Sequence, residues 1–314
     1  MNIILLGYNG IVGSHVLVDL FKKYKKTYNL KIICVGRNVE NKPLKKKYIT
    51  YVEWDFLNFS KLKFFLQNKS IIINCVGKNF SNLEDLVEIN VIFIQKLINY
   101  IYDNKISAHL IHLSSVSLYS VEKKSFNKVK NISENSKIKS NNSYSKSKLD
   151  ADLFIQNSIK KNNKFSYTIL RISNVFSYSK SSNIFALISF LLKKGIWLRC
   201  SNYTRYHFIH AKDVASAVSL CTLDIKTSRN KIYIVSDDNN QSQLHDIYAK
   251  KYNLNLLRIP ISLRMIRFIN KYFFIPKKMQ SLFFTISSEI NYDSSKIKKE
   301  LNFKTLYSLM DKII

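Results

Sequence analysis

The chain has 314 residues, of which 46% are hydrophobic and 23% charged, enough apolar material for two lobes that share one cleft. No apolar run reaches the ~18 residues that cross a bilayer, and Met1 leads directly into a short apolar run without the basic segment of a signal peptide. The cysteines Cys34, Cys75, Cys200 and Cys221 lie far apart, so neither a disulfide framework nor a metal site is predicted. We expect a reduced, cytoplasmic enzyme.

The net charge is +29, from 50 Lys and Arg against 21 Asp and Glu. A basic chain can bind nucleic acid or an anionic membrane. Here the excess is spread through a chain also rich in Asn, Ile and Tyr, so we attribute it to an AT-rich coding sequence and do not expect nucleic-acid binding. The strongest candidate patch is 263–278, where cations and aromatics mix on an amphipathic pattern. It could contact a membrane weakly, but we favour an apolar lid helix over the substrate cleft.

A strand, a tight turn and a helix are predicted at the start of the chain. The apolar run 2–6 gives way to apolar residues at helical spacing over 12–21. Between them lie Gly7, Gly10 and Gly13, three of the six glycines in the chain. Such glycines permit a sharp turn and a close approach of the backbone to a pyrophosphate at the helix N-terminus. The pattern favours a dinucleotide site over an ordinary glycine-rich turn.

The end of the second predicted strand indicates which dinucleotide binds. The run 30–36 ends at Gly36, followed by Arg37. An NAD site usually closes this strand with an acidic residue, whereas an Arg can pair with the 2′-phosphate of NADP. NADP is therefore favoured over NAD, unless Arg37 is simply exposed.

Apolar, β-branched runs alternate with amphipathic or polar stretches through the first half of the chain. The first five of six such runs precede stretches of helical pattern, which predicts an α/β fold with a Rossmann-type doubly wound parallel sheet. The segment 84–102 suits a helix packed on that sheet. The runs are 2–6, 30–36, 48–54, 70–76, 109–115 and 166–172.

After residue 174 the strict alternation fails, although strands near 231–235 and 255–259 remain plausible. Helices are expected near 182–194, 211–223, 242–252 and 261–285. We predict a Rossmann domain over 1–174 and a smaller substrate-binding lobe over 175–314, with some segments of the latter returning to the Rossmann domain.

The most informative motif is Tyr144-x-x-x-Lys148 at the start of a helical pattern. A spacing of four places both side chains on one helical face. An ammonium beside a phenol favours the phenolate and lowers a pKa that is ordinarily about 10. The pair can then transfer protons at neutral pH. The alternative is a solvated helix face.

Together these residues resemble the extended short-chain dehydrogenase/reductase family of nucleotide-sugar epimerases, dehydratases and reductases. Further motifs in the family's order are Ser114–Tyr119, Leu170–Phe176, Phe208–Ala217 and Asp293–Phe303. The resemblance implies that Ser115, Tyr144 and Lys148 are catalytic. It implies cofactor contacts at Gly7, Gly10, Ile11, Val12, Gly13, Arg37, Asp55, Phe56, Val76, Gly77, Asn90, Tyr144 and Lys148. It implies substrate contacts at Tyr119, Asn174 and Arg205.

The resemblance also narrows the reaction. A dehydratase of the family carries Asp-Glu where this chain has Val116 and Ser117, so dehydration is disfavoured. Epimerisation or keto-sugar reduction remains, by hydride transfer at C4 of a nucleotide sugar used for surface polysaccharide, in a homodimer.

The segment 205–210 departs from the family's pattern. Tyr206 stands where the family carries a phosphate-binding Arg, with Arg205 shifted by one, and His210 is expected to be structural. The alternative function is a non-catalytic relative that binds RNA or assists assembly. Such relatives typically lose the Tyr, the Lys or the glycine turn, all of which are present here.

Overall fold

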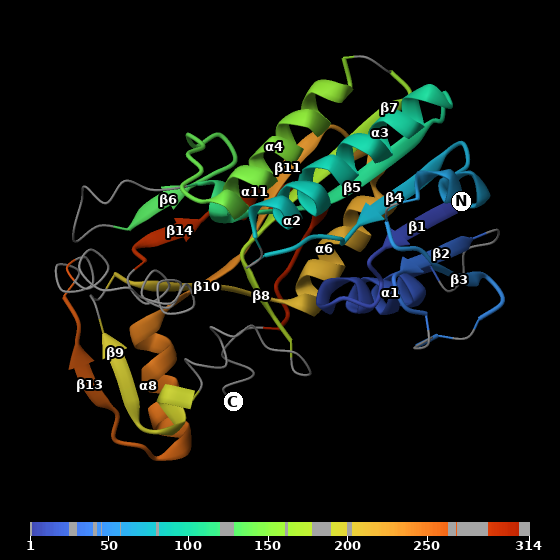
Figure 1. Cartoon of the computed structure of the whole chain (residues 1–314). Helices are drawn as coiled ribbons and strands as arrows, with labels where there is room; N and C mark the ends of the chain where they lie inside the picture. The colour runs from blue at the N-terminus through green and yellow to red at the C-terminus, as the bar shows by residue number, and fades with distance from the viewer. Residues whose placement is uncertain are drawn as a thin grey trace.

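The computed structural model describes residues 2–24, 30–39, 43–44, 46–56, 58–79, 82–119, 129–160, 163–177, 190–199, 203–262, 268 and 288–307. They build one large sheet with helices on both faces and a smaller group of elements to one side (Figure 1).

The large sheet has seven strands in the order β11-β7-β5-β4-β1-β2-β3, all parallel. All six predicted apolar runs form strands of this sheet, which confirms the predicted doubly wound fold. Strand order reverses between β1 and β4, which leaves a crevice at the carboxyl ends of the strands. The strands are β1 (Asn2–Leu6), β2 (Lys31–Gly36), β3 (Ile49–Glu53), β4 (Ser70–Asn74), β5 (Ala108–Ser115), β7 (Phe165–Ile172) and β11 (Lys231–Val235).

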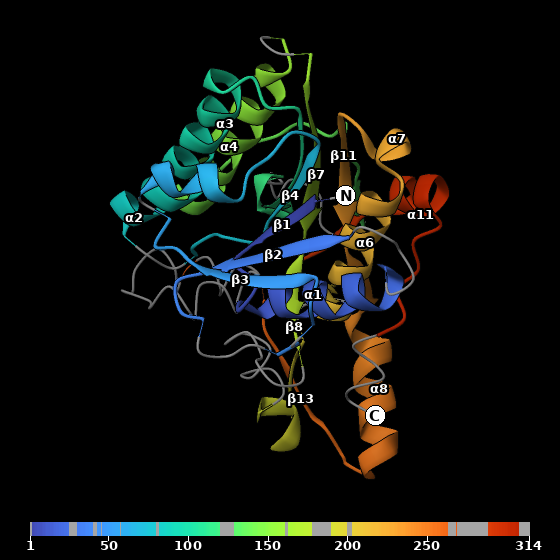
Figure 2. The same ribbon diagram turned by 90° about the vertical axis from the view of Figure 1, so that its right-hand side faces the viewer.

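Helices cover both faces of this sheet (Figure 2). Successive side chains of a strand point to opposite faces, so Ile3 and Leu5 enter one hydrophobic cluster while Ile4 and Leu6 enter the other. Burial on both faces explains why the strands read as continuous apolar runs. One face carries α1 (Ile11–Tyr24), α6 (Ala211–Leu223), α7 (Ile225–Ser228) and α11 (Ser295–Leu301). The other carries α2 (Leu83–Val87), the π-helix η2 (Glu88–Ile92), α3 (Phe93–Asp103) and α4 (Ser143–Ser158).

Two local predictions need correction. The described residues between β2 and β3 include no helix, so the expected helical stretch after this strand is wrong there; Pro43 disfavours a helix at that point. After β3 the helix is a short 3₁₀ segment, η1 (Phe59–Phe64). The predicted helix over 84–102 is confirmed, with a π-helical turn in its middle.

The structure also has three small sheets. Of their strands, only the one near 255–259 was predicted. Their strands have three to six residues each, too few for periodicity to identify. One sheet joins β12 (Asp237–Asn240), β10 (Arg205–His210) and β8 (Asn174–Phe176). The others pair β13 (Leu257–Pro260) with β9 (Ile196–Arg199), and β14 (Ile290–Tyr292) with β6 (Lys130–Ile132).

The helix α8 (Gln241–Tyr252) lies with β9 and β13 away from the large sheet (Figure 1). The strand β11 and the helix α6 pack into the large sheet. Both elements follow residue 174, the predicted end of the Rossmann domain. The division of the chain into two domains at that residue stays a prediction. Residues 200 and 269–287, and with them most of the candidate patch and the expected helix over 261–285, lie outside the described residues.

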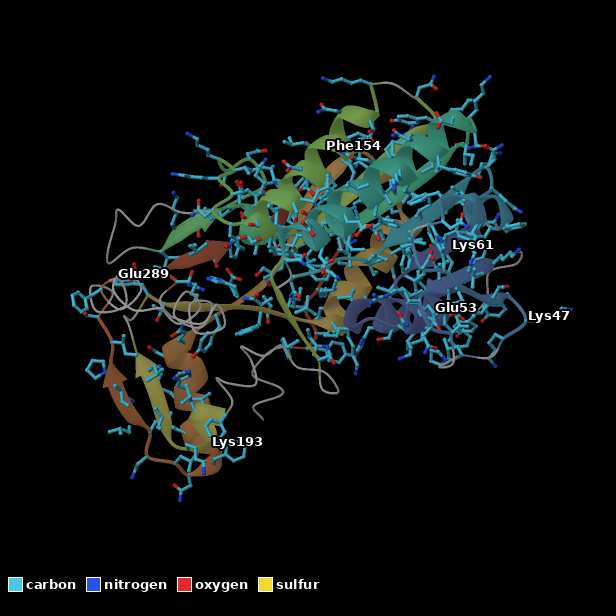
Figure 3. All side chains as sticks on the ribbon, viewed as in Figure 1. Lys47, Glu53, Lys61, Phe154, Lys193 and Glu289 are labelled. Carbon is cyan, nitrogen blue, oxygen red and sulfur yellow. The ribbon has the colours of Figure 1, made fainter. Side chains whose placement is uncertain are left out.

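Composition-based expectations can be checked for the described part of the chain. It contains no helix long and apolar enough to span a membrane and no group of three potential metal ligands. Cys34, Cys75 and Cys221 are free thiols. Lys47 and Lys61 lie on the side of the molecule that carries the N-terminal strands, whereas Lys193 lies at the opposite end (Figure 3).

Candidate active site

The glycine turn between β1 and α1 is closely packed. Gly7 has φ +77°, a conformation that favours glycine. The Gly10 amide donates to the Gly7 carbonyl at 3.1 Å, and a Cβ on Gly13 would lie 2.1 Å from that same oxygen. No other residue type fits at position 13. The turn therefore brings bare backbone to the N-terminus of α1, where Ile11 and Val12 begin the helix, and this geometry fits a dinucleotide pyrophosphate.

The carboxyl ends of β2 and β3 carry the residues that were predicted to contact the adenosine part of the dinucleotide. Gly36 ends β2 and Arg37 is exposed just beyond it. Asp55 is exposed after β3, and its carboxylate accepts a hydrogen bond from the Asn58 amide at 3.3 Å. Phe56 has φ +67° and its ring is buried against Trp54, so only its backbone can face a ligand.

The three predicted catalytic side chains meet at the carboxyl end of β5. Ser115 ends this strand, and its hydroxyl lies close enough to that of the half-buried Tyr144 to lower the pKa of the phenol. Lys148, one turn further along α4, is 5% exposed and donates from Nζ to the Leu113 carbonyl at 3.0 Å. The helix begins where it does because Asn142 and Ser145 form a capping box.

The loop after β4 lies directly against Lys148. A Cβ on Gly77 would stand 3.1 Å from Lys148 Nζ, so the chain passes very near this ammonium. Asn90, from the π-helix, fixes this loop: its side chain accepts from the Lys78 amide and donates to the Lys78 carbonyl, both at 3.0 Å. It also donates to Ser147 Oγ at 3.0 Å. Asn90 is thus placed to position the loop on which Val76 and Gly77 lie.

The charge states of the pair differ from the expectation. Burial raises the pKa of Tyr144, with the Asp152 carboxylate adding to the rise, although the neighbouring Ser115 hydroxyl has a lowering effect. The expected depression by Lys148 is therefore not the net result in the unliganded fold. Burial lowers the pKa of Lys148 to about 8, against a smaller raising effect of Asp152. At neutral pH the site holds a phenol beside an ammonium.

A buried ion pair lies beneath the catalytic helix face and was missed at the sequence level. Asp152 follows Lys148 by four residues and is fully buried, with its Oδ2 3.0 Å from Arg171 Nε. Arg171 also donates to the Tyr119 hydroxyl, which in turn donates to the Glu134 carbonyl at 3.2 Å. The extension of the Tyr-x-x-x-Lys spacing by one more turn could have indicated Asp152.

This network decides the position of Tyr119, which was predicted to contact substrate. Tyr119 is 2% exposed and its hydroxyl is engaged on both sides. It braces Arg171 inside the protein, so its hydroxyl is not presented to a sugar. The residue type suited a sugar contact, but the direction of its side chain was set by the buried guanidinium.

The other two predicted substrate residues lie on the three-stranded sheet. Asn174 is exposed at the start of β8, paired in register with Phe208 of β10. Arg205 begins β10; its Nε is buried, and no described residue accepts a hydrogen bond from it. Tyr206 points elsewhere, hydrogen-bonded to His245 at 3.0 Å.

His210 has the structural role that was expected. It is fully buried, and its Nδ1 accepts from the Lys212 amide at the start of α6. The Cys75 thiol also lies near Lys148, but burial raises its pKa to about 12, which keeps it protonated.

A glycine turn, a switch point, and a Ser and a Tyr grouped with a buried Lys define a Rossmann-fold protein of the short-chain dehydrogenase/reductase class. A model of the NAD dependent epimerase/dehydratase family matches residues 3–236, and the chain belongs to that family. The resemblance found from the sequence motifs is thereby confirmed.

Solved structures share the fold over the whole chain at low identity. UDP-glucuronic acid 4-epimerase from Bacillus cereus, in complex with NAD, has a TM-score of 0.71 at 16% identity over 100% of this chain and 94% of its own. dTDP-glucose 4,6-dehydratase from Bacillus anthracis, also with NAD, has a TM-score of 0.71 at 15% identity over 100% and 94%. RMD from Pseudomonas aeruginosa, complexed with NADPH, has 0.66 at 13% over 99% and 96%. The search of curated proteins gave no match.

Proposed function

We propose that the protein is an NADP-dependent epimerase or keto-sugar reductase of nucleotide sugars, acting at C4. The observation that carries the proposal is the grouping of Ser115, Tyr144 and Lys148 at the edge of the sheet where the glycine turn also lies. Val116 and Ser117 in place of an acidic pair argue against dehydration. The use of the product in surface polysaccharide and the dimeric state are part of the same proposal.

The nicotinamide cofactor would supply or accept the hydride, and the protein's own residues would handle the proton. Tyr144 would give its proton to a sugar carbonyl or take one from a hydroxyl, with Ser115 hydrogen-bonded to the same oxygen. Lys148, which lies against the Gly77 loop, would contact the cofactor ribose and stabilise the phenolate that forms.

The substrate class is supported by Arg205 and by the relatives. A buried guanidinium nitrogen without an acceptor in the described part of the chain suits an anionic ligand, and the diphosphate of a nucleotide sugar is such a ligand. Asn174 would hydrogen-bond the same group. The enzyme MoeE5, similar in fold with a TM-score of 0.71 at 16% identity, was solved with UDP-glucose and NAD.

The preference for NADP gives a direct prediction. Most of the similar structures were solved with NAD, yet this chain places Gly36 and the exposed Arg37 at the end of β2. We expect tighter binding of NADPH than of NADH, and Arg37→Ala should narrow the difference by weakening NADPH only, because the guanidinium would pair with the 2′-phosphate. Calorimetry with both cofactors measures this; equal affinities in the native protein would contradict it.

The reaction itself is tested by incubating the protein with NADPH and a panel of nucleotide 4-keto sugars and nucleotide hexoses. A reductase should oxidise NADPH in proportion to product. An epimerase should invert one carbon without net change in cofactor. The Tyr144→Phe protein is the matched control for contaminating activity. Loss of water from the sugar, or no reaction with any member by a protein that binds NADPH, would contradict the proposed reaction.

A further inference from the structure

Tyr8 occupies an unusual position inside the glycine turn, between Gly7 and Asn9. Its side chain does not face solvent: it is 1% exposed. The ring packs edge-on against Tyr51 of β3, with centroids 5.2 Å apart, and the hydroxyl donates to the Asn38 carbonyl at 3.3 Å. A large aromatic side chain thus reaches from the pyrophosphate turn to the ends of β2 and β3.

The ring closes the space over Gly36. A Cβ on Gly36 would lie 2.9 Å from Tyr8 Cε1 and 3.2 Å from Asn9 Oδ1, whereas carbon atoms in contact stand about 3.5 to 4.0 Å apart. Tyr8 is held by burial, by Tyr51 and by its hydrogen bond, so it cannot move aside freely. Residue 36 is where a carboxylate would bind the ribose hydroxyls of NAD, and with Tyr8 present no side chain fits there.

The groups that remain at this strand end are not acidic. Asn9 is exposed, and its amide donates to the Asn38 carbonyl at 3.2 Å. Arg37, which follows Gly36, is exposed. One carboxylate stands nearby on the neighbouring strand: Glu53 pairs in register with Gly36 and is exposed at the edge of the sheet (Figure 3).

We propose that Tyr8 is a specificity-determining residue of the cofactor site, acting through Gly36. Its ring excludes an acidic side chain from the end of β2 and leaves the adenosine ribose to Asn9 and Arg37, an arrangement suited to a 2′-phosphorylated dinucleotide. The inference rests on the proposed function, because it takes the turn to be a dinucleotide site. It makes the discrimination between NADP and NAD a joint property of residues 8 and 36.

A double-substitution cycle tests this coupling. The native protein, Tyr8→Ala, Gly36→Asp and the double variant are compared by calorimetry with NADPH and NADH and by thermal unfolding without ligand. Gly36→Asp alone should lower the melting temperature by several degrees and weaken both cofactors about tenfold, because the new side chain meets the Tyr8 ring. In the Tyr8→Ala background the same substitution should cost little stability and turn the preference toward NADH by about tenfold, a departure from additivity typical of residues in contact.

Three further variants keep the outcome interpretable. Tyr8→Phe retains the ring and should behave as the native protein toward substitution at 36. Gly36→Ala adds only the Cβ and should show the same non-additive melting temperatures if Gly36→Asp does not fold. Glu53→Gln should leave the ratio of the two affinities unchanged.

Additive effects in a protein that binds NADPH would overturn the inference and leave the proposed function standing. Control of the affinity ratio by Glu53 would also overturn it. A native protein that binds neither dinucleotide would overturn the proposed function, and the inference with it.

Discussion

Replacement of Tyr144 by Phe should lower turnover by about a hundredfold or more, the usual effect of losing a positioned acid or base. The substitution removes one hydroxyl and almost no volume, so the melting temperature and the affinity for NADPH should stay close to those of the native protein. Because the Ser115 hydroxyl lies beside that of Tyr144, Ser115→Ala should slow turnover while leaving cofactor binding nearly intact. Steady-state kinetics with the substrate found in the panel, together with calorimetry, measure both effects.

Lys148→Met distinguishes the role of Lys148 from that of Tyr144, the proposed proton carrier. Lys148 lies against Gly77 of the cofactor loop, so its loss should weaken cofactor binding, which Tyr144→Phe should not. Lys146→Met is a matched control, because Lys146 lies on the same helix but is exposed and paired with Asp150. Near-native turnover in Tyr144→Phe would mean that the motif is only a face of the helix.

Asp152→Ala should destabilise the fold by about 3 to 5 kcal/mol, because it leaves the buried Arg171 guanidinium without its carboxylate. Urea unfolding measures this loss. Replacing both partners by apolar residues, as in Asp152→Leu with Arg171→Met, should recover most of the stability, since the cost comes from the unpaired charge and not from the absence of the pair. A loss within about 1 kcal/mol for Asp152→Ala would contradict the importance of this ion pair.

Asp152 also acts on Lys148, and the pH dependence of activity should reveal this effect. The Asp152 carboxylate raises the pKa of Lys148 against the larger lowering by burial, which leaves it at about 8. In the free enzyme kcat/KM should fall as the pH rises through this value, because the ammonium loses its proton. In Asp152→Asn the raising charge is gone, so the fall should begin at lower pH. A merely structural role for Asp152 would lower activity without moving the profile.

Much of this molecule follows from local sequence. Strands buried on both faces read as continuous apolar runs, and all six predicted runs joined the large sheet because burial, not pairing partner, sets that pattern. The glycine turn was equally visible, since φ +77° at Gly7 and the 2.1 Å approach at Gly13 admit glycine almost alone. The Tyr144–Lys148 spacing needs only a helix to place both groups on one face. Apart from the strands near 231–235 and 255–259, the short strands after residue 174 left no comparable signal.

Directions of side chains and net electrostatics depended on the tertiary structure. Tyr119 had the residue type of a sugar contact, but the buried Arg171 fixed it inside the protein. The spacing of Tyr144 and Lys148 predicted a lowered phenol pKa, but burial raised this pKa and the Asp152 carboxylate added to the rise. Tyr8 gave no sign in sequence of filling the space over Gly36. Hydrophobic periodicity and the backbone conformations that each residue type allows determine which residues share a helix or strand. Packing between elements that are distant in sequence determines what each side chain contacts, and therefore its charge and its role.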